Sequence, residues 1–582
     1  MWRSLSTVRK YLWRYRGGMA LGMLYLVLKD LAQVAQPLMI GRAVDSLKAA
    51  GGGRAATLFT RYVVYLLLFA VLKAIFQFGM RVTLIGISRD VEYDLRNDLF
   101  AHLMGLAPDY YARTRTGDIM ARATNDLNAV RMMLGPGVMY WGETSLTFVL
   151  ALGVMLKVDW RLALYALLPA PAVSLAVLVS GRIIHARFEK IQAMFSDISS
   201  RVQENLSGVR MVRAFVQERA EMRRFAELNR QYIAQNLKLV RIQAIFEPTL
   251  EVLVGATFLL VLWMGGRDVL ERRISMGSFV MFNTYMGMLV WPMIALGWVV
   301  NLMQRGGASL GRINQILDER ASIRPPENPT RLANVAGEIE FRGVTMDYGA
   351  GPVLDAVSLR IRAGETIAVV GHTGAGKSTL VSLAPRLMDP SAGAVLLDGI
   401  DVRSLDPADL RRQIGFVPQE TFLFSATIAQ NIAFGVEDAS ADEIRRAAET
   451  AGLAGDIEGF PAGYETMVGE RGITLSGGQK QRAAIARAIL RDPRILILDD
   501  ALSSVDTLTE ERILTQLAGV MRGRTVILIS HRVSTVRQAD RIVVLAAGRI
   551  VEQGTHAELT EAGGYYADLC RKQMLEEELE AI

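Results

Sequence analysis

The first half of the chain contains long apolar stretches that alternate with charged segments. An α-helix needs roughly 20 apolar residues to cross a bilayer. Six stretches approach this length: Met19–Ile40, Tyr62–Ile85, Leu134–Val154, Leu162–Ser180, Leu250–Met264 and Phe279–Met303. The fifth is short, and we expect neighbouring residues to extend it. The pattern therefore predicts an α-helical membrane domain of six transmembrane helices.

The connections between these stretches differ in length and charge. Stretches three and four are joined by a short loop, as are five and six. The segments Ser88–Arg131 and Arg182–Arg241 are instead long, charged and helical in pattern. Basic residues favour the cytoplasmic side of a membrane. We therefore expect both long segments to be cytoplasmic extensions, and an even number of spans returns the chain to the cytoplasm.

The N-terminal segment Met1–Gly18 carries five basic residues and no acidic one, together with several aromatic residues. This composition predicts an amphipathic elbow helix on the anionic inner face of a membrane. The apolar run that follows is too long for the core of a cleaved signal peptide. We therefore predict a multi-pass protein of the cytoplasmic (inner) membrane, with its N-terminus in the cytoplasm.

The pattern changes after a linker. Three prolines fall within Ile323–Thr330, where they prevent a continuous helix. Short β-branched runs then alternate with helical segments, which predicts an α/β domain with a largely parallel sheet. The expected strands are Thr366–Val370, Ile495–Leu498, Thr525–Ile529 and Arg541–Leu545. The predicted organisation is a membrane domain over 1–316, a linker over 317–336 and a cytoplasmic α/β domain over 337–582.

Composition adds little to this picture. The net charge of +6 fits juxtamembrane basic residues as well as a nucleic-acid surface. With six spans we expect the lipid bilayer as a partner and no nucleic acid. Cys570 is the only cysteine, so an intrachain disulfide is excluded.

The segment Gly371–Ser378 fits the pattern G-x-x-x-x-G-K-[ST] between an expected strand and an expected helix, which is typical of a phosphate-binding loop. Glycines let backbone N–H groups surround the phosphates of ATP, and the helix N-terminus adds positive potential. Lys377 is expected to reach the β- and γ-phosphates and Ser378 to bind Mg²⁺. The expected nucleotide-binding residues of this segment are Gly371, Thr373, Gly374, Gly376, Lys377, Ser378 and Thr379.

Two further segments are candidates for binding ions. Asp499 ends a buried apolar strand, where a carboxylate is well placed to bind Mg²⁺. Ser476, Gly477, Gly478 and Gln479 begin a helix and offer a second anion site. A simple helix cap by Ser476 explains the same residues. One ATP needs one phosphate cradle, so two such sites suggest that ATP lies between two subunits.

These motifs make the second half resemble the ATPase domain of ABC transporters, in order along the chain. Tyr348 matches the aromatic residue that stacks on adenine, Gln419 the Q-loop glutamine and His531 the switch histidine. The segments 468–472, 475–479 and 503–506 match the X-loop, the ABC signature and the D-loop. The resemblance implies a catalytic role for Asp500, His531 and Gln419. It also implies Mg²⁺ ligation by Ser378, Gln419 and Asp499, with the signature acting on a partner's ATP.

A membrane domain followed by an ATPase domain in one chain resembles the ABC exporters. In that family the two long cytoplasmic loops carry coupling helices, which match positions near Tyr110–Thr124 and Gly208–Phe215 here. Any amphipathic cytoplasmic helix would show a similar pattern.

One position departs from the family. The residue after the Walker B aspartate is usually glutamate, which polarises the attacking water, and here it is Asp500. The shorter side chain withdraws the carboxylate, and a misplacement of about 1 Å can cost on the order of 100-fold in rate. The same change occurs in subunits of heterodimeric multidrug and antigen-peptide-transporter-like exporters. The resemblance thus implies a second, different half-transporter as partner. A slow homodimer is the alternative.

The substrate is less defined. Thr284, Met288, Trp291, Ala295 and Trp298 share one face of the sixth stretch, which fits either a cavity for amphipathic drugs, lipids or peptides or ordinary helix packing. Intramembrane polar residues usually face a cavity or a partner. Among them, Lys29 and Asp30 are adjacent on a helix and so need not pair. A homodimeric lipid flippase and an ATP-gated channel or regulator are the alternative functions.

Overall fold

The computed structural model describes residues 5–49, 53–332, 334–349, 351–469, 475–505 and 507–580. The chain forms two compact units. One comprises Met1–Met104 and Thr116–Glu319, and the other comprises Gly105–Arg115 and Arg320–Ile582. The short segment 105–115 thus belongs with the C-terminal unit although it lies within the N-terminal half of the sequence. It contains helix α4 (Pro108–Arg113), and Ser322 Oγ donates to Asp109 Oδ1 over 3.2 Å.

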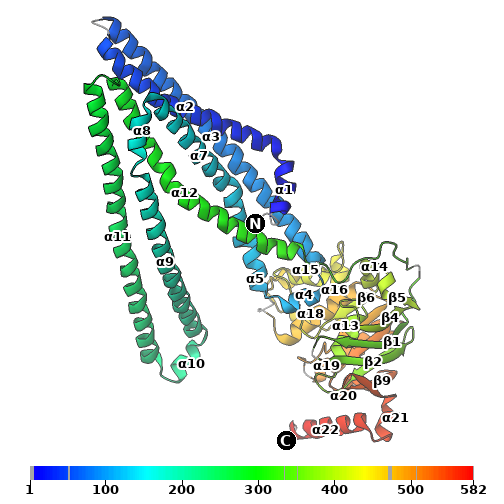
Figure 1. Ribbon diagram of the computed structural model, residues 1–582. Coiled ribbons are helices and arrows are strands. Elements are labelled where there is room, and N and C mark those ends of the chain that lie inside the picture. Colours follow the sequence, from blue (N-terminus) through cyan, green and yellow to red (C-terminus); the bar gives the residue numbers. More distant parts are fainter. Residues whose placement is uncertain are drawn as a thin grey trace. The chain divides into compact units, whose positions relative to one another are not determined.

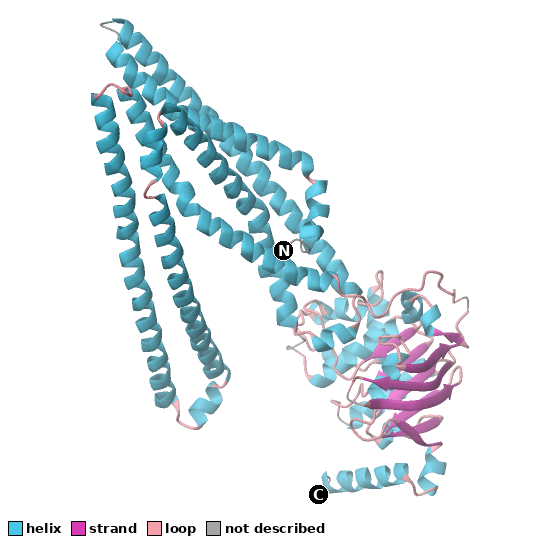
Figure 2. Ribbon diagram, viewed as in Figure 1, coloured by secondary structure: helices cyan, strands magenta, loops and turns pink. Residues whose placement is uncertain are grey.

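The N-terminal unit consists of helices joined by short loops, with no strand among its described residues (Figures 1 and 2). Six helical segments are long and apolar enough to cross a membrane: Arg16–Leu47, Ala56–Gly105, Thr116–Val158, Trp160–Ser207, Glu218–Leu270 and Met276–Leu317. Each contains one of the six predicted stretches, so the prediction of six spans is confirmed. The fifth stretch is extended as expected, because it is the end of helix α11 (Glu218–Leu270).

The principal helices run well beyond the apolar stretches. They are α2 (Arg16–Ala49), α3 (Gly53–Gly105), α7 (Val138–Val158), α8 (Trp160–Leu167), α9 (Ala170–Ser207), α11 and α12 (Met276–Leu317). Figure 1 shows α9 and α11 side by side, joined by the short helix α10 (Val209–Ala214). Helix α10 falls within the segment Gly208–Phe215 that the sequence assigns to a coupling helix.

The third span is assembled from several pieces. Helices α5 (Thr116–Ala121), α6 (Leu127–Met132) and α7 are connected by π-helical turns η1 (Arg122–Asp126) and η2 (Met133–Gly137). Asp126 in η1 is buried and binds α12, where it accepts from Arg312 Nε over 2.8 Å and from Ser309 Oγ over 2.9 Å. The irregular backbone thus places a carboxylate against a neighbouring helix, as single π turns often do at functional positions.

The predicted N-terminal helix is α1 (Leu5–Arg14), and two aspartates of α3 hold it. The hydroxyl of Tyr11 donates to Asp98 over 2.7 Å, and that of Tyr15 donates to Asp94 over 3.0 Å. Lys10 and Arg14 form ion pairs with the same two carboxylates. Because the acceptors are four residues apart, they lie on one face of α3 and fix the direction of α1.

Lys29 and Asp30 are paired, which corrects the expectation that they need not be. Lys29 Nζ lies 2.7 Å from Asp30 Oδ1 and 2.6 Å from Oε1 of Glu143 on α7. Adjacent helical residues do diverge at Cβ, but the four-carbon stem of lysine lets its ammonium group return to the neighbouring carboxylate. Both side chains are fully buried, so an unpaired charge would be costly at either position.

The C-terminal unit contains two sheets. The six-stranded sheet has the order β10-β9-β3-β8-β7-β6, and a four-stranded sheet has the order β2-β1-β4-β5. In the larger sheet β3 (Thr366–Val370), β6 (Ile414–Val417), β7 (Ile495–Asp499), β8 (Thr525–Ile529) and β9 (Arg541–Ala546) are parallel. Strand β10 (Arg549–Gly554) is antiparallel at the edge. The predicted largely parallel sheet is confirmed, with all four predicted strands in place. The smaller sheet comprises β1 (Ile339–Asp347), β2 (Pro352–Ile361), β4 (Ala392–Leu397) and β5 (Ile400–Asp401).

Strand β3 shows why its sequence is apolar throughout. Ile367 and Val369 lie in a core between the sheets, whereas Ala368 and Val370 lie in a second core beneath helices. Alternate side chains of a strand point to opposite faces, so a strand buried on both faces must be apolar at every position. The helices are α13 (Lys377–Leu383), α14 (Pro407–Arg412), α15 (Ile428–Ala433), α16 (Ala441–Thr450), α17 (Ala454–Glu458), α18 (Gly477–Leu490), α19 (Thr507–Met521), α20 (Val533–Val536), α21 (His556–Glu561) and α22 (Tyr565–Glu580).

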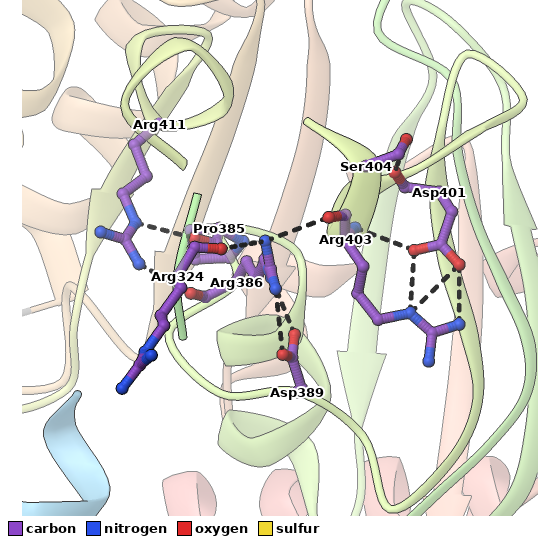
Figure 3. A network of polar contacts seen from close by, with 8 residues as sticks. All are labelled: Arg324, Pro385, Arg386, Asp389, Asp401, Arg403, Ser404 and Arg411. Atoms are coloured by element: carbon purple, nitrogen blue, oxygen red, sulfur yellow. Dashed lines mark hydrogen bonds and ion pairs between the residues drawn. The ribbon is translucent and has the colours of Figure 1, made fainter. Parts of the chain in front are cut away.

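The predicted linker is irregular between residues 321 and 330, and it is attached to the C-terminal unit by hydrogen bonds. Figure 3 shows Arg386 at the centre of this attachment. The Arg386 side chain is buried and forms two hydrogen bonds with Asp389, the shorter 2.9 Å long. It also donates to the carbonyls of Arg324 and Arg403 over 3.5 and 3.4 Å. Arg411 donates in turn to the carbonyls of Pro385 and Arg386.

We expect Arg386→Ala to lower the thermal midpoint of the C-terminal unit by roughly 5–10 °C, because it removes a buried guanidinium that binds the Asp389 carboxylate and two main-chain carbonyls. Arg412→Ala is the matched control, since Arg412 pairs with Asp409 at the same kind of i,i+3 spacing but is mostly exposed. Exposed pairs contribute about 0–1 kcal/mol, so the control should hardly change the midpoint. Scanning calorimetry of the detergent-purified protein distinguishes the two. Equal midpoints for both variants would contradict the role of Arg386.

Candidate nucleotide-binding site

The loop between β3 and α13 contains three glycines with positive φ, and two of them also lack space for a side chain. Gly371 and Gly376 have φ values of 152° and 99°. A Cβ atom on Gly371 would lie 2.1 Å from the carbonyl oxygen of Leu545, and one on Gly376 would lie 2.8 Å from that of Val353. The glycines of the motif therefore serve close packing of the loop against neighbouring strands as well as backbone conformation.

Lys377 begins α13, and its side chain returns to the loop that precedes it. Its Nζ donates to the carbonyls of Gly371 over 2.8 Å and His372 over 3.0 Å. Burial lowers the pKa of Lys377, and the nearby charges of Asp500 and Asp499 oppose that shift. The loop thus holds a lysine ammonium group among its own backbone atoms, where a phosphate group could compete for it.

Asp499 and Ser378 meet across two elements. Asp499 is buried at the end of β7, and Ser378 Oγ in the first turn of α13 donates to its Oδ1 over 3.1 Å. Burial raises the pKa of Asp499, and the hydrogen bond from Ser378 lowers it. A hydroxyl and a carboxylate at this separation are the oxygen donors that Mg²⁺ prefers, so these residues fit the expected metal.

One cavity collects most of the predicted residues. It is lined by Val353, Thr373, Gly374, Gly376, Lys377, Ser378, Thr379, Gln419, Asp499, Asp500, Ile529 and His531. Val353 belongs to β2 of the smaller sheet, and the other residues end or follow β3, β6, β7 and β8, which are consecutive in the larger sheet in the order β3-β8-β7-β6. Val353 and Ile529 were not predicted. Ile529 could have been predicted to line the cavity, because it ends a strand two residues before His531. Val353 belongs to no motif, so the sequence gives no such indication for it.

Two predicted residues lie beside this cavity and do not line it. Gly371 begins the loop directly after β3. Tyr348 is mostly exposed, and its hydroxyl lies 3.4 Å from Thr379 Oγ1 and 3.2 Å from Met388 Sδ. An exposed aromatic ring next to the phosphate-binding loop is available to stack on a base.

Asp500 has an unusual and firmly held backbone. Its φ is 50°, in the left-handed region that aspartate tolerates better than most side chains. Its N–H donates to the carbonyl of Ile529 over 3.0 Å, and its carbonyl accepts from Ser503 Oγ over 3.0 Å. Gln481 Nε2 lies 3.5 Å from the same carbonyl. The main chain is therefore fixed on both sides of Asp500, and the carboxylate reaches only as far as its single methylene allows.

The signature segment lies elsewhere in the unit. Ser476 caps α18 through a reciprocal capping box with Gln479. The amide of Gln479 also donates to Asp456 over 2.9 Å, and a Cβ on Gly478 would lie 3.0 Å from the carbonyl of Ser504. Ser476, Gly477, Gly478 and Gln479 are absent from the lining of the cavity described above. Residues 470–472 of the predicted X-loop and residue 506 of the predicted D-loop lie outside the described residues.

The fold and this site together define an ABC transporter in the exporter arrangement, with its membrane domain before its ATPase domain. The family profile "ABC transporter transmembrane region" matches residues 19–293, and "ABC transporter" matches residues 354–503. The chain belongs to this family. The α-helical membrane domain and α/β ATP-binding domain predicted from the sequence are thereby confirmed.

Full-length relatives agree. A probable multidrug resistance ABC transporter ATP-binding/permease protein of Bacillus subtilis is 37% identical over 98% of both chains. An ATP-dependent lipid A-core flippase of Syntrophus aciditrophicus is 38% identical over 85% of this chain and 82% of its own. A bacterial Atm1-family ABC exporter solved with ATP bound superimposes with a TM-score of 0.79 at 29% identity. That match covers 97% of this chain and 98% of the solved one.

Proposed function

We propose that this chain is one half of an ATP-driven exporter that moves hydrophobic or amphipathic substrates across the cytoplasmic membrane by alternating access. The observation that carries the proposal is the cavity formed by Lys377, Ser378, Gln419, Asp499 and His531 in a chain with six candidate membrane spans. Relatives named for multidrug resistance and for lipid A flipping support small amphipathic molecules, including drugs and lipids, as the substrate class. The N-terminus and the ATPase unit are assigned to the cytoplasm, on the basic N-terminal segment and the even number of spans.

Within the site, each residue has a proposed role. Lys377 binds the β- and γ-phosphates, Tyr348 stacks on adenine, and Ser378, Gln419 and Asp499 hold Mg²⁺, which neutralises the phosphates when bound. Asp500 and His531 act on the attacking water and the γ-phosphate. The signature segment Ser476–Gln479 acts on ATP held by a second subunit, because it does not line the cavity of its own chain.

The second subunit is proposed to be a different half-transporter with glutamate after its Walker B aspartate. The support is the position of Asp500, whose carboxylate is one methylene short. The hydrogen bonds that fix its main chain prevent the backbone from advancing to compensate. A carboxylate withdrawn by about 1 Å polarises water poorly. The site that this chain builds is therefore assigned slow hydrolysis, and the site completed by its signature is assigned fast hydrolysis.

A homodimeric lipid flippase is the second candidate, and the 38% identity to a lipid A-core flippase favours it. Purification of the tagged chain from its native membrane, followed by ATPase assay, separates the two. The heterodimer predicts that a second ABC half-transporter co-purifies and that the chain expressed alone hydrolyses ATP at least about 10-fold more slowly than the complex. A chain that purifies alone with full activity would contradict the heterodimer and favour the flippase.

A further inference from the structure

Two helices of the membrane unit bring three charged side chains into direct contact. Lys29 and Asp30 lie near the middle of α2 and are fully buried. The Lys29 ammonium group bridges Asp30 at 2.7 Å and Glu143 of α7 at 2.6 Å. Charged residues within membrane spans are costly, and those that occur usually serve a site or a proton path.

The Lys29 ammonium group does not provide a partner for every oxygen of these two carboxylates. Asp30 Oδ1 accepts from Lys29 and also from Thr147 Oγ1 over 3.0 Å. Asp30 Oδ2 is buried and has no hydrogen-bond partner among the described residues. An ionised carboxylate oxygen left bare in a low-dielectric interior is among the most expensive groups a protein can bury.

The surroundings offer no direct partner for this oxygen. Lys73 on α3 is half-buried and interacts electrostatically with Lys29, Asp30 and Glu143. It forms no ion pair or hydrogen bond with them among the described residues. Helix α12, which packs against α2, has no charged residue between Met276 and Gln304. The group that best fits a buried carboxylate oxygen without a hydrogen-bond donor is a proton.

We propose that Asp30 is a proton-binding site within the membrane unit, reached through Glu143 and Lys29. The order of exposure supports the path, because the Glu143 side chain is 23% exposed whereas Lys29 and Asp30 are fully buried. A hydronium ion from the solvent gives its proton to the partly exposed carboxylate of Glu143 and leaves as water. Lys29 then passes one of its ammonium protons to Asp30 and regains one from Glu143. The net change is one hydronium proton transferred from the solvent to Asp30, with Lys29 again an ammonium ion and Glu143 again ionised.

Protonation removes the charge of Asp30 and leaves Lys29 paired with Glu143 alone. A movement of α7 relative to α2 during transport would alter the exposure of Glu143 and the contacts of Asp30. Any state that binds the proton more tightly is favoured by acid, and by reciprocity acid shifts the cycle toward that state. The transport rate is therefore expected to depend on pH through Asp30, whatever the exported molecule is.

Infrared difference spectroscopy of the purified transporter complex in lipid nanodiscs tests proton binding directly and needs no substrate. A protonated carboxyl group has its own C=O band. We expect such a band to grow on acidification and to be absent from Asp30→Asn. The control is Glu189→Gln, which removes the band of an exposed carboxyl group. The Asp30 band should appear at a higher pH than the Glu189 band. Glu189 on α9 has a side chain that is 70% exposed. An Asp30 band at the same pH as that of Glu189, or at a lower pH, would overturn the proposal.

Thr147→Val keeps the test decisive if Asp30→Asn fails to assemble. This variant removes a hydrogen bond that stabilises the ionised form of Asp30, so the band should move to still higher pH. An unchanged band would mean that Asp30 is not the titrating group. In sealed inverted vesicles, the wild-type uptake rate should change roughly fivefold or more across the pH interval in which the Asp30 band appears, and that of Asp30→Asn should not. Equal pH responses in the two proteins would count against the proposal, even if ATP-driven uptake itself is observed.

Discussion

The Ser476→Arg variant should lose at least about 100-fold in steady-state ATPase activity, whereas Asp500→Asn should change it by no more than about twofold. Ser476 caps α18 with a small hydroxyl side chain, and Gly477 and Gly478 follow it without side chains. An arginine here fills the space through which the helix N-terminus would reach a partner's γ-phosphate. Asp500 belongs to the site that we propose to be slow, so its loss should remove little turnover.

The comparison needs a control for the loss of a helix cap. Ser440 caps α16 through the same kind of capping box, with Glu443 as its reciprocal partner. Ser440→Arg therefore imposes the same local change away from any ATP, at a cost of about 1 kcal/mol in stability. We expect it to retain most of the activity. If Asp500→Asn abolishes hydrolysis while Ser476→Arg leaves it intact, the assignment of the slow and fast sites is reversed.

Lys377→Ala should weaken ATP binding to this subunit by roughly 10- to 100-fold, because a charge-assisted hydrogen bond contributes about 1.5–3 kcal/mol. The ammonium group already lies within the loop, held by the carbonyls of Gly371 and His372. Photolabelling of this subunit with an azido-ATP analogue measures the effect. Lys572→Ala, an exposed change on α22 of the same unit, is the control and should label normally. Unchanged labelling of Lys377→Ala would reject the assignment of Lys377.

The elements of this fold could be predicted from sequence where burial is nearly complete. Strands β3 and β8 begin and end at the predicted residues, because a strand covered on both faces is apolar at every position and is bounded abruptly by polar residues. The positions of the membrane spans could be predicted, but the lengths of their helices could not. Helix α11 runs for 53 residues, since a helix continues past the membrane wherever polar residues still favour it.

The candidate site could be predicted where a backbone requirement leaves a motif. Gly371 and Gly376 could be predicted from the motif, because a Cβ at either position would collide with the strands beside the loop. Val353 left no such trace, because an apolar strand residue has the same appearance whether it lines a cavity or a core. Three features depend on tertiary contacts. They are the pairing of Lys29 with Asp30, the backbone conformation of Asp500, and the association of residues 105–115 with the ATPase unit. Local periodicity does not encode such contacts.

The central claim is that ATP hydrolysis by the assembled transporter, at a site completed by the signature segment of this chain, drives export. Its most direct test is the uptake of a fluorescent amphipathic dye or lipid into sealed inverted vesicles that contain the complete transporter. We predict accumulation that requires ATP, is lost with a non-hydrolysable analogue, and is lost in the Ser476→Arg variant while Ser440→Arg retains it. ATP-gated conductance of ions down their gradient, without accumulation of any amphipathic probe, would contradict the claim and identify a channel instead.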